Sequence, residues 1–270
     1  MKQQFRTIVI SDVHLGIKDS KAKELTRFLK YNSCKTLILN GDIIDGWQLR
    51  KGGKWKKMHT RLFSMLIKLA ASGKTEIIYT RGNHDDFLDE IVPFVFGNFS
   101  IVRDLEIKCG DKTYYVVHGD VFDHITSNMR WIAKLGDVGY TLLLRINRYY
   151  NKRRQKKGLP YYSLSQKMKS MIKSAVSFIG SYEEKLSEIA KVKNCDGIIC
   201  GHIHQPANKI IDGIHYLNSG DWVESLTALT ESFDGEWNVV HYMEWEKEYR
   251  MQKEIESRSR EYKLVHPKAS

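Results

Sequence analysis

The sequence predicts an α/β sandwich, in which a pair of mixed β-sheets is covered by helices. Three observations lead to this fold class. Short apolar runs alternate with amphipathic segments in the first 80 residues, and Gly-Asp or Asp-Gly turn signals separate paired β-rich segments after residue 100. In addition, 42% of the 270 residues are hydrophobic, which is enough for a packed core.

The first part of the chain has the order expected of parallel strands joined by helices. Three β-rich runs are expected to be buried strands, and two segments with apolar residues on one face are the helices between them. This βαβαβ order favours right-handed crossovers and therefore parallel strands. The expected elements are strand Thr7–Ile10, helix Lys21–Tyr31, strand Thr36–Leu39, helix Met58–Ala71 and strand Glu76–Thr80.

The second part predicts antiparallel hairpins. Gly110-Asp111, Asp212-Gly213 and Asp234-Gly235 each stand between two β-rich segments, and such dipeptides favour the tight turns of hairpins. A further buried strand is expected at Gly197–Cys200. The paired segments are Leu105–Cys109 with Thr113–Val117, Lys209–Ile211 with Ile214–Leu217, and Ser225–Glu231 with Glu236–His241.

A helical insertion is expected to interrupt this core. The segment between His118 and His202 carries apolar residues of helical type and then a basic run from Arg145 to Lys157. We expect several helices that form a cap over the strand ends. The predicted organisation is a core of residues 1–122 and 193–242, a cap of residues 123–192, and a charged tail of residues 243–270 that forms a solvated helix.

The balance of charge favours an anionic partner. The chain has 43 lysine and arginine residues against 32 acidic residues, which gives a formal net charge of +11 and an isoelectric point near 9.3. Such a charge attracts nucleic acid, a phosphorylated substrate or an acidic membrane surface. A basic enzyme that binds no polymer fits the charge equally well.

The cysteines and the apolar runs predict a cytoplasmic location. Cys34, Cys109 and Cys200 lie in or beside apolar runs, and the four cysteines form no CxxC pair, which is typical of a reducing compartment. The chain begins with a strand pattern instead of the apolar core of a signal peptide. No apolar run approaches the roughly 18 residues that span a bilayer.

Five short motifs, each following an apolar run, carry the residues that indicate a function. They offer carboxylates, an amide and imidazoles at strand ends, where open α/β sheets bind ligands. Taken singly, each has an ordinary structural explanation, such as turn geometry for a Gly-Asp pair. Five in succession favour one metal site. The motifs are Ser11-Asp12-Val13-His14, Gly41-Asp42, Gly82-Asn83-His84-Asp85, His118-Gly119-Asp120 and Gly201-His202-Ile203-His204.

The spacing within the motifs fits a site for two metal ions. Asp12 and His14 are one residue apart, so in an extended chain their side chains point to the same side and reach one ion. Asp42 has two oxygens that are able to bridge two ions about 3.5 Å apart, as in two-metal hydrolases. His202 and His204 are placed to share one ion or to be divided between two. Because histidine suits Mn, Fe or Zn better than Mg or Ca, we expect two divalent ions, Mn²⁺ first, with Fe or Zn as alternatives.

This set of motifs resembles the calcineurin-like metallophosphoesterases over residues 6–242, apart from the insertion. The resemblance implies a four-layer α/β/β/α sandwich and a dimetal phosphoester hydrolase. It implies that His84 faces the substrate and that Asp85 orients His84. The implied ligands are Asp12, His14, Asp42 and His204 for one ion, and Asp42, Asn83, His118 and His202 for the other.

Three further segments are similar to the UDP-2,3-diacylglucosamine hydrolase branch of that family. These are Gly41–Trp47, Asn83–Leu88 and Gly220–Glu224, and the helical insertion has the same place in the chain. The resemblance implies cleavage of the pyrophosphate of UDP-2,3-diacylglucosamine to lipid X and UMP in lipid A biosynthesis, with the cap receiving the acyl chains. One departure is His84, because better-known members of the branch carry Arg there.

The expected partners follow from this substrate. A lipid-linked sugar nucleotide would bind near the basic residues Arg81, Arg145, Arg148 and Arg153, although a structural role is equally expected for Arg81. The basic run would also attach the protein peripherally to the anionic inner face of the bacterial cytoplasmic membrane. For this block, the structural alternative is a plain helical cap with a solvated charged face.

Two other functions compete with this interpretation. The first is a metallophosphoesterase acting on another nucleotide, on nucleic acid or on a phosphoprotein. Nucleic acid is the less favoured partner and stays open because tyrosine pairs at 149–150 and 161–162 flank the basic run. The second is a non-catalytic scaffold, which is disfavoured because every expected metal ligand is present.

Overall fold

The computed structural model describes residues 3–122, 152–158 and 164–265 of the chain, which divides into two compact units. The first unit comprises Met1–Gly119 and Ala190–Ser270, and the second comprises Asp120–Ile189. Residues 123–151 and 159–163 of the expected cap lie outside the described residues. Arg145 and Arg148, two of the expected substrate contacts, are among them.

A seven-stranded mixed sheet forms the centre of the first unit. Its order is β12-β11-β1-β2-β3-β5-β4. Strands β1, β2 and β3 are parallel, as the βαβαβ pattern predicted, and β5 pairs in parallel with β3. Strands β4 and β5 form an antiparallel pair at one edge that the sequence did not predict. The strands are β1 Gln3–Ile10, β2 Asn32–Asn40, β3 Glu76–Thr80, β4 Phe94–Phe96, β5 Phe99–Val102, β11 Thr227–Glu231 and β12 Trp237–His241.

The second sheet has five strands in the order β6-β7-β8-β10-β9. The predicted hairpins β6–β7 and β9–β10 are antiparallel, whereas β7, β8 and β10 run parallel to one another. The carboxyl ends of β7 and β8 therefore point the same way, which matters for the metal site. These strands are β6 Asp104–Cys109, β7 Lys112–Val117, β8 Gly197–Cys200, β9 Ala207–Ile211 and β10 Ile214–Asn218.

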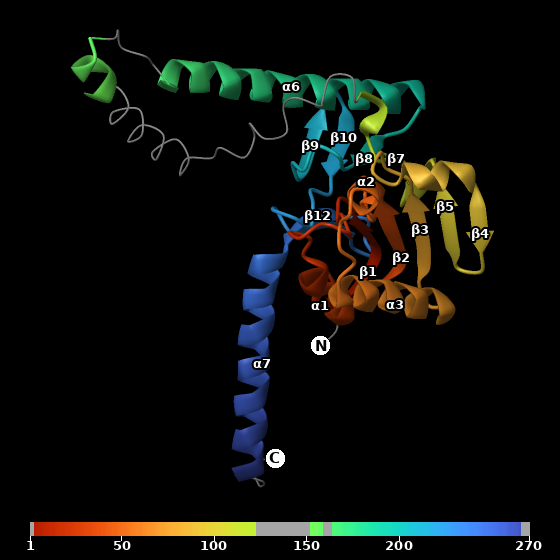
Figure 1. Cartoon of the computed structure of the whole chain (residues 1–270). Helices are drawn as coiled ribbons and strands as arrows, with labels where there is room; N and C mark the ends of the chain where they lie inside the picture. Colours follow the sequence, from red (N-terminus) through yellow and green to blue (C-terminus); the bar gives the residue numbers. More distant parts are fainter. Residues whose placement is uncertain (1–2, 123–151, 159–163, 266–270) are drawn as a thin grey trace. The chain divides into compact units, whose positions relative to one another are not determined.

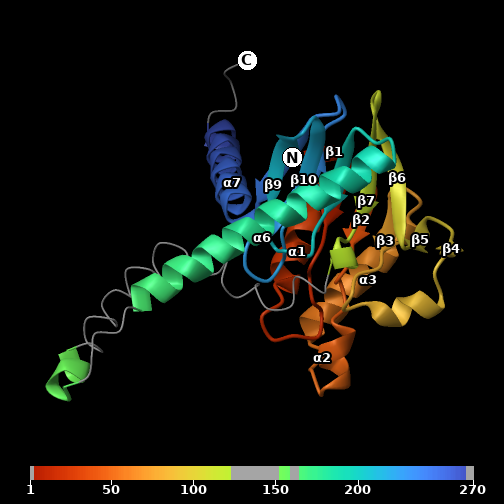
Figure 2. The ribbon, with the colours of Figure 1, turned by 90° about the horizontal axis from the view of Figure 1, so that it is seen from above.

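The alternation of side chains along each strand separates two cores. Ile8 and Ile10 of β1 pack with helices α1 (Ala22–Tyr31) and α3 (Lys57–Ala71), which lie on the same side of the larger sheet (Figures 1 and 2). Val9, between them, faces the other way and packs against the smaller sheet. Two stacked sheets with helices outside confirm the predicted α/β sandwich.

Three short elements follow the ends of parallel strands. Helix α2 (Gly46–Arg50) follows β2, and Asp45 caps it by accepting a hydrogen bond from the Gln48 N–H. The 3₁₀ segment η1 (Asp86–Glu90) follows β3. A second 3₁₀ segment, η2 (Asp120–Phe122), follows β7. These elements hold the loops that carry the candidate ligands.

The C-terminal helix α7 (Tyr242–Val265) occupies the segment that was expected to be a solvated helix. Its first turns instead belong to the core, because Trp245 is only 8% exposed and packs edge-on against Phe28 of α1. Tyr249 packs against Tyr31 with the rings tilted and their centroids 4.4 Å apart. The charged composition of the tail concealed these aromatic contacts.

In the second unit, the described part of helix α6 (Leu164–Val192) has a regular buried face. Tyr182 and Leu186 are buried at a spacing of four residues, and Ala190, where α6 enters the first unit, continues the same stripe. Within the described ranges, no helix combines the length and the apolar character needed to cross a membrane.

Replacing Trp245 tests whether the start of α7 belongs to the core. We expect Trp245→Ala to lower the free energy of unfolding by about 3 kcal/mol, because a large buried ring is removed. Trp55→Ala is the matched control, since Trp55 is 41% exposed, and its cost is expected to stay below about 1 kcal/mol. Urea denaturation followed by circular dichroism measures both. Equal costs for the two variants would contradict the packed position of α7.

Candidate metal centre

The candidate ligands converge because their loops follow strands whose carboxyl ends meet. The larger sheet supplies ligands after β1, β2 and β3, and the smaller sheet supplies them after β7 and β8. Asn40, the last residue of β2, ties the two sheets together at this point: its side-chain amide donates to the Val117 carbonyl at 3.1 Å. The ligands are Asp12 and His14 after β1, Asp42 after β2, Asn83 after β3, His118 after β7, and His202 and His204 after β8.

The backbone is strained at most of these positions. The φ angle is positive at five of the seven candidate ligands, although such angles are uncommon for residues other than glycine. Conformations of this kind persist only where surrounding interactions hold them, and they cluster at functional sites. The five residues and their φ angles are Asp12 (52°), His14 (49°), Asp42 (53°), His202 (68°) and His204 (57°).

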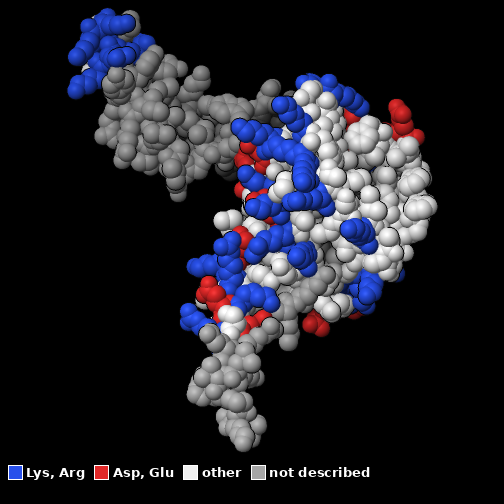
Figure 3. Space-filling view, turned by 60° about the horizontal axis from the view of Figure 1, so that its bottom comes forward, with Lys and Arg blue, Asp and Glu red and all other residues white. Residues whose placement is uncertain are grey.

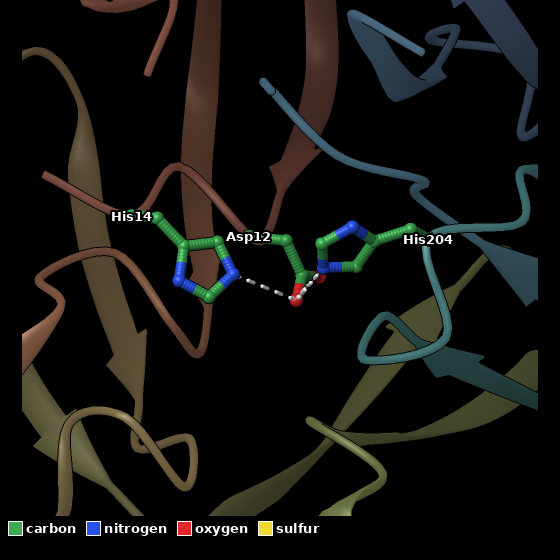
Figure 4. A group of neighbouring side chains, drawn as sticks. All are labelled: Asp12, His14 and His204. Carbon is green, nitrogen blue, oxygen red and sulfur yellow. Dashed lines mark ion pairs between the residues drawn. The ribbon is translucent and has the colours of Figure 1, made fainter. Parts of the chain in front are cut away.

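One group of donors surrounds the Asp12 carboxylate. Asp12 Oδ1 lies 3.1 Å from His204 Nε2 and 3.8 Å from His14 Nε2, and Figure 4 shows the carboxylate between the two rings. Asp12 Oδ2 accepts a hydrogen bond from the His202 backbone N–H at 3.0 Å. Burial alone would raise the pKa of Asp12, but the adjacent His204 holds it well below its ordinary value. The carboxylate also raises the pKa of His204, against the effect of burial.

A second group of donors surrounds the Asp42 carboxylate. Asp42 Oδ2 lies 3.4 Å from His118 Nε2 and 3.8 Å from His14 Nε2, while Asp42 Oδ1 accepts a hydrogen bond from the His84 backbone N–H at 2.8 Å. Ligand atoms of Asp42, His118 and His202 all lie within 4.8 Å of one another. His14 therefore lies near both carboxylates, and Asp42 is the carboxylate placed between the two groups.

The tautomer of His118 is fixed by the backbone. Its Nδ1 lies 2.8 Å from the Asn40 carbonyl oxygen, which only accepts hydrogen bonds, so Nδ1 carries the proton. The lone pair is then on Nε2, the nitrogen nearest Asp42. This arrangement is the usual way in which proteins prepare a histidine to bind a metal.

Asp45 positions two histidines and was not assigned a role from the sequence. Its two oxygens lie 3.2 Å from His14 Nδ1 and 3.1 Å from His84 Nδ1. Burial would raise the pKa of Asp45, but the hydrogen bonds from these rings and from the Gln48 N–H hold it well below its ordinary value. Its position three residues after Asp42, at the start of α2, is the signal that could have revealed it.

Asp85 lies elsewhere than the resemblance implied. Its two oxygens accept hydrogen bonds from the backbone N–H groups of Ile43 and Ile44, at 3.1 and 2.9 Å. Burial and the neighbouring Asp42 raise the pKa of Asp85 to about 8, although these hydrogen bonds oppose the change. Asp85 therefore fixes the loop after Asp42, and the carboxylate beside the His84 ring is Asp45.

Trp47 covers the other side of His84. The two rings are in contact at a tilt of 34°, with centroids 4.4 Å apart, and the Trp47 indole N–H donates to Asp86 at 3.0 Å. Trp47 is still 37% exposed. His84 is thus held between an aromatic face and the Asp45 carboxylate.

Two motif glycines are needed for the close approach of the ligand loops. A Cβ at Gly82 would collide with Asp42 Oδ1, and a Cβ at Gly201 would collide with the side chains of Ser11 and Asp12. Any side chain at either position would push these carboxylates out of place.

The donor set fits divalent metal ions. Buried oxygens of Asp12, Asp42 and Asn83 have no hydrogen-bond partner within the described part of the chain. Buried polar atoms of this kind are costly unless something else satisfies them. Together with the imidazole nitrogens, they form the mixed oxygen and nitrogen set that Mn, Fe and Zn prefer.

The expected substrate contacts are less defined. Arg81 forms an ion pair with Asp89, with Arg81 Nε 3.1 Å from Asp89 Oδ1, which is a structural role. Arg153 is exposed on the helical segment at residues 152–156, in the second unit. Its role as a substrate contact stays a prediction.

Comparison with known proteins supports the character of this site. The chain matches the model of a family described as calcineurin-like phosphoesterase over residues 5–206. No curated protein matches the sequence.

Similar solved structures have low sequence identity to this chain. One is a hypothetical protein from Pyrococcus horikoshii, with a TM-score of 0.47, 10% identity, and coverage of 93% of this chain and 94% of that chain. Another is a conserved uncharacterized protein, a predicted phosphoesterase, from Streptococcus pneumoniae, with a TM-score of 0.36, 14% identity, and coverage of 88% and 97%. A third, from Thermotoga maritima, has a TM-score of 0.41, 15% identity, and coverage of 88% and 99%.

Substitution of Asp42 tests the central position of its carboxylate. In Asp42→Asn the hydrogen bond from the His84 N–H can still form, but the charge between the two donor groups is lost. We expect Mn²⁺ binding to weaken by about 100-fold or more, measured by elemental analysis after dialysis against buffered metal. Asp86→Asn is the matched control, because among the described residues the Asp86 carboxylate contacts the Trp47 indole and the Arg50 guanidinium instead of the candidate ligands, and its loss should leave metal content unchanged. Full metal content in Asp42→Asn would contradict the assignment.

Proposed function

Because this chain belongs to the calcineurin-like phosphoesterase family, whose members are metal-dependent phosphoester hydrolases, we propose that it cleaves the pyrophosphate of UDP-2,3-diacylglucosamine. The products would be lipid X and UMP. The single observation that carries the hydrolase function is the Asp42 carboxylate between two groups of metal-ligating side chains. We propose Mn²⁺ as the metal, with Fe or Zn as alternatives.

The chain supplies the remaining chemistry around the metals. When bound, two divalent ions would activate water and neutralise charge on the phosphate. Asp12, His14, Asp42, Asn83, His118, His202 and His204 would hold them. Asp45 Oδ1 lies 3.1 Å from His84 Nδ1, and the opposite edge of the ring, Nε2, lies 3.9 Å from Asp42 Oδ2. From there His84 is placed to stabilise charge on a phosphoryl oxygen or to protonate the leaving oxygen.

The choice of a lipid-linked sugar nucleotide rests on the similar segments. Asp45 and Trp47, from Gly41–Trp47, both contact His84, so this segment bears directly on the substrate side of the site. In Gly220–Glu224, Asp221 accepts hydrogen bonds from the N–H groups of Val223 and Glu224, and Trp222 is buried in the core. The helical insertion supports the same substrate, because acyl chains need an apolar receptor.

His84 favours a second candidate. Better-known members of the lipid branch carry Arg at this position, and an imidazole is a smaller, titratable group with different hydrogen-bonding geometry. The second candidate is a phosphoesterase of the same family that acts on another nucleotide, on nucleic acid or on a phosphoprotein. Under the first candidate, the basic run at residues 145–157 would also contact an anionic membrane surface.

A substrate panel separates the two candidates. With the Mn²⁺-loaded protein we expect kcat/KM for UDP-2,3-diacylglucosamine to exceed that for UDP-N-acetylglucosamine by about 100-fold or more, because remote binding energy from the acyl chains contributes to the reaction. Mass spectrometry would detect UMP and lipid X. A dinucleotide, a cyclic nucleotide and a phosphopeptide complete the panel. A higher kcat/KM for any of these would select the second candidate.

Replacing Asp45 tests its action through His84. We expect Asp45→Asn to lower kcat by about 10- to 100-fold on a chromogenic phosphodiester at saturating Mn²⁺, while metal content stays at the normal value. His84→Ala should cause a comparable loss. Because the two residues act together, the double variant should lose less than the product of the single losses. Fully multiplicative losses would show that Asp45 acts independently of His84.

A further inference from the structure

A second site of concentrated charge lies on the core, on α1, α3 and α7. A cavity of about 620 Å³ opens between α1, the first turns of α3 and the start of α7. Figure 3 shows Lys and Arg side chains crowded along one side of the face seen there, while much of the remainder is uncharged. Two acidic side chains line the cavity, against six cationic ones: Lys21, Lys23, Arg27, Lys30, Arg61 and Arg250.

The acidic residues leave much of this charge without a counter-ion. Glu246 is shared by Arg27 Nε at 3.2 Å and by an Arg250 nitrogen at 2.9 Å, so it neutralises at most one of them. Lys21, Lys23 and Arg61 have no acidic partner within 4.0 Å in the described ranges. Like charges held together at low separation repel one another, and a bound anion relieves that repulsion.

The same cavity offers a helix N-terminus. Lys21 is the N-cap residue of the ten-residue helix α1, its side chain makes no capping hydrogen bond, and Glu24 is the one acidic residue of the first turn. The helix dipole favours an anion at this position. The backbone here is held firmly, since the Lys21 N–H donates to the Trp222 carbonyl at 2.9 Å.

The apolar part of the lining limits what the cavity accepts. Met58 and Met243 contribute side chains from α3 and α7. Tyr31 also lines it, but its ring already packs against Tyr249 and lies near the Arg27 guanidinium. The tyrosines are therefore not presented for stacking on the successive bases of a nucleic acid, which is what single-stranded nucleic-acid sites require.

We propose that this cavity binds a small soluble anion carrying two or more phosphate groups. Its volume is that of a site for a small molecule, and its cations converge from three helices instead of extending along a stripe. Multiple phosphates match several lysine and arginine side chains at once, and they meet the N-terminus of α1 as well. The site is separate from the metal ligands and does not depend on the proposed substrate.

Two methionines provide a direct reading of occupancy. The full-length protein is labelled with ¹³C-methyl methionine and studied by NMR, once without Mn²⁺ and once loaded with Mg²⁺. The variants Met58→Leu and Met243→Leu identify the signals of the two cavity methionines. Titration with inorganic tripolyphosphate should shift both signals and reach saturation. Pyrophosphate should bind more weakly, and monophosphate more weakly again, because fewer charges are matched. These signals do not depend on catalysis, so they remain informative whether or not the proposed hydrolysis is found.

A charge-matched pair of variants decides whether the site is specific. Lys21→Ala/Lys23→Ala should raise the Kd for tripolyphosphate by about tenfold or more. Lys108→Ala/Lys112→Ala removes the same charge from the exposed β6–β7 hairpin and should leave the Kd unchanged. Circular dichroism melting confirms that both variants fold. Absence of saturable shifts, equal weakening in both variants, or shifts produced only by anionic vesicles or an RNA oligonucleotide would overturn the proposal.

Discussion

The carboxylates of Asp12 and Asp42 are ionised although both residues are fully buried, and the centre of the first unit is arranged around their charge. An unpaired buried carboxylate would be protonated or would destabilise the fold by several kcal/mol. Here burial raises the pKa of both, but the neighbouring histidine rings hold it below the ordinary value. Two carboxylates this close also repel each other, which explains why cations belong between them. The histidine rings that stabilise the buried carboxylates in the folded chain also complete a set of donors suited to divalent metal ions.

Holding these carboxylates in place requires contributions from distant parts of the chain. Asp12 accepts from the His202 N–H across 190 residues of sequence, and the Trp222 N–H donates to the Asp12 carbonyl at 3.0 Å. The left-handed backbone at Asp12 and Asp42 is maintained by such contacts and would relax without them. Glycine at positions 82 and 201 permits the loops to approach. The strain is local, but its support extends through both sheets.

Local patterns were sufficient for most of the elements and for locating the candidate ligands, and they failed where tertiary contacts decide. Strand Glu76–Thr80 and the hairpin turns follow from alternation and turn residues, which act over a few neighbours. The β4–β5 edge was missed because its strands have three and four residues and little alternation. Trp245 was missed because a charged helix gave no sign of its aromatic partner in α1. Asp45 and Asp85 have the same chemistry, and only the folded loop shows which one lies beside His84.

His84 is held in place differently from the candidate metal ligands. The metal ligands are fixed by buried charge, so substitutions there alter the whole centre. His84, in contrast, is held by Asp45 on one side and by the partly exposed Trp47 on the other, at the margin of the ligand groups. A residue outside the network around the buried carboxylates can be substituted at a smaller cost in folding free energy. Changes at His84 and Trp47 would therefore disturb the buried carboxylates less than changes at the candidate ligands would, and the motif set accordingly indicates the reaction more sharply than it indicates the substrate.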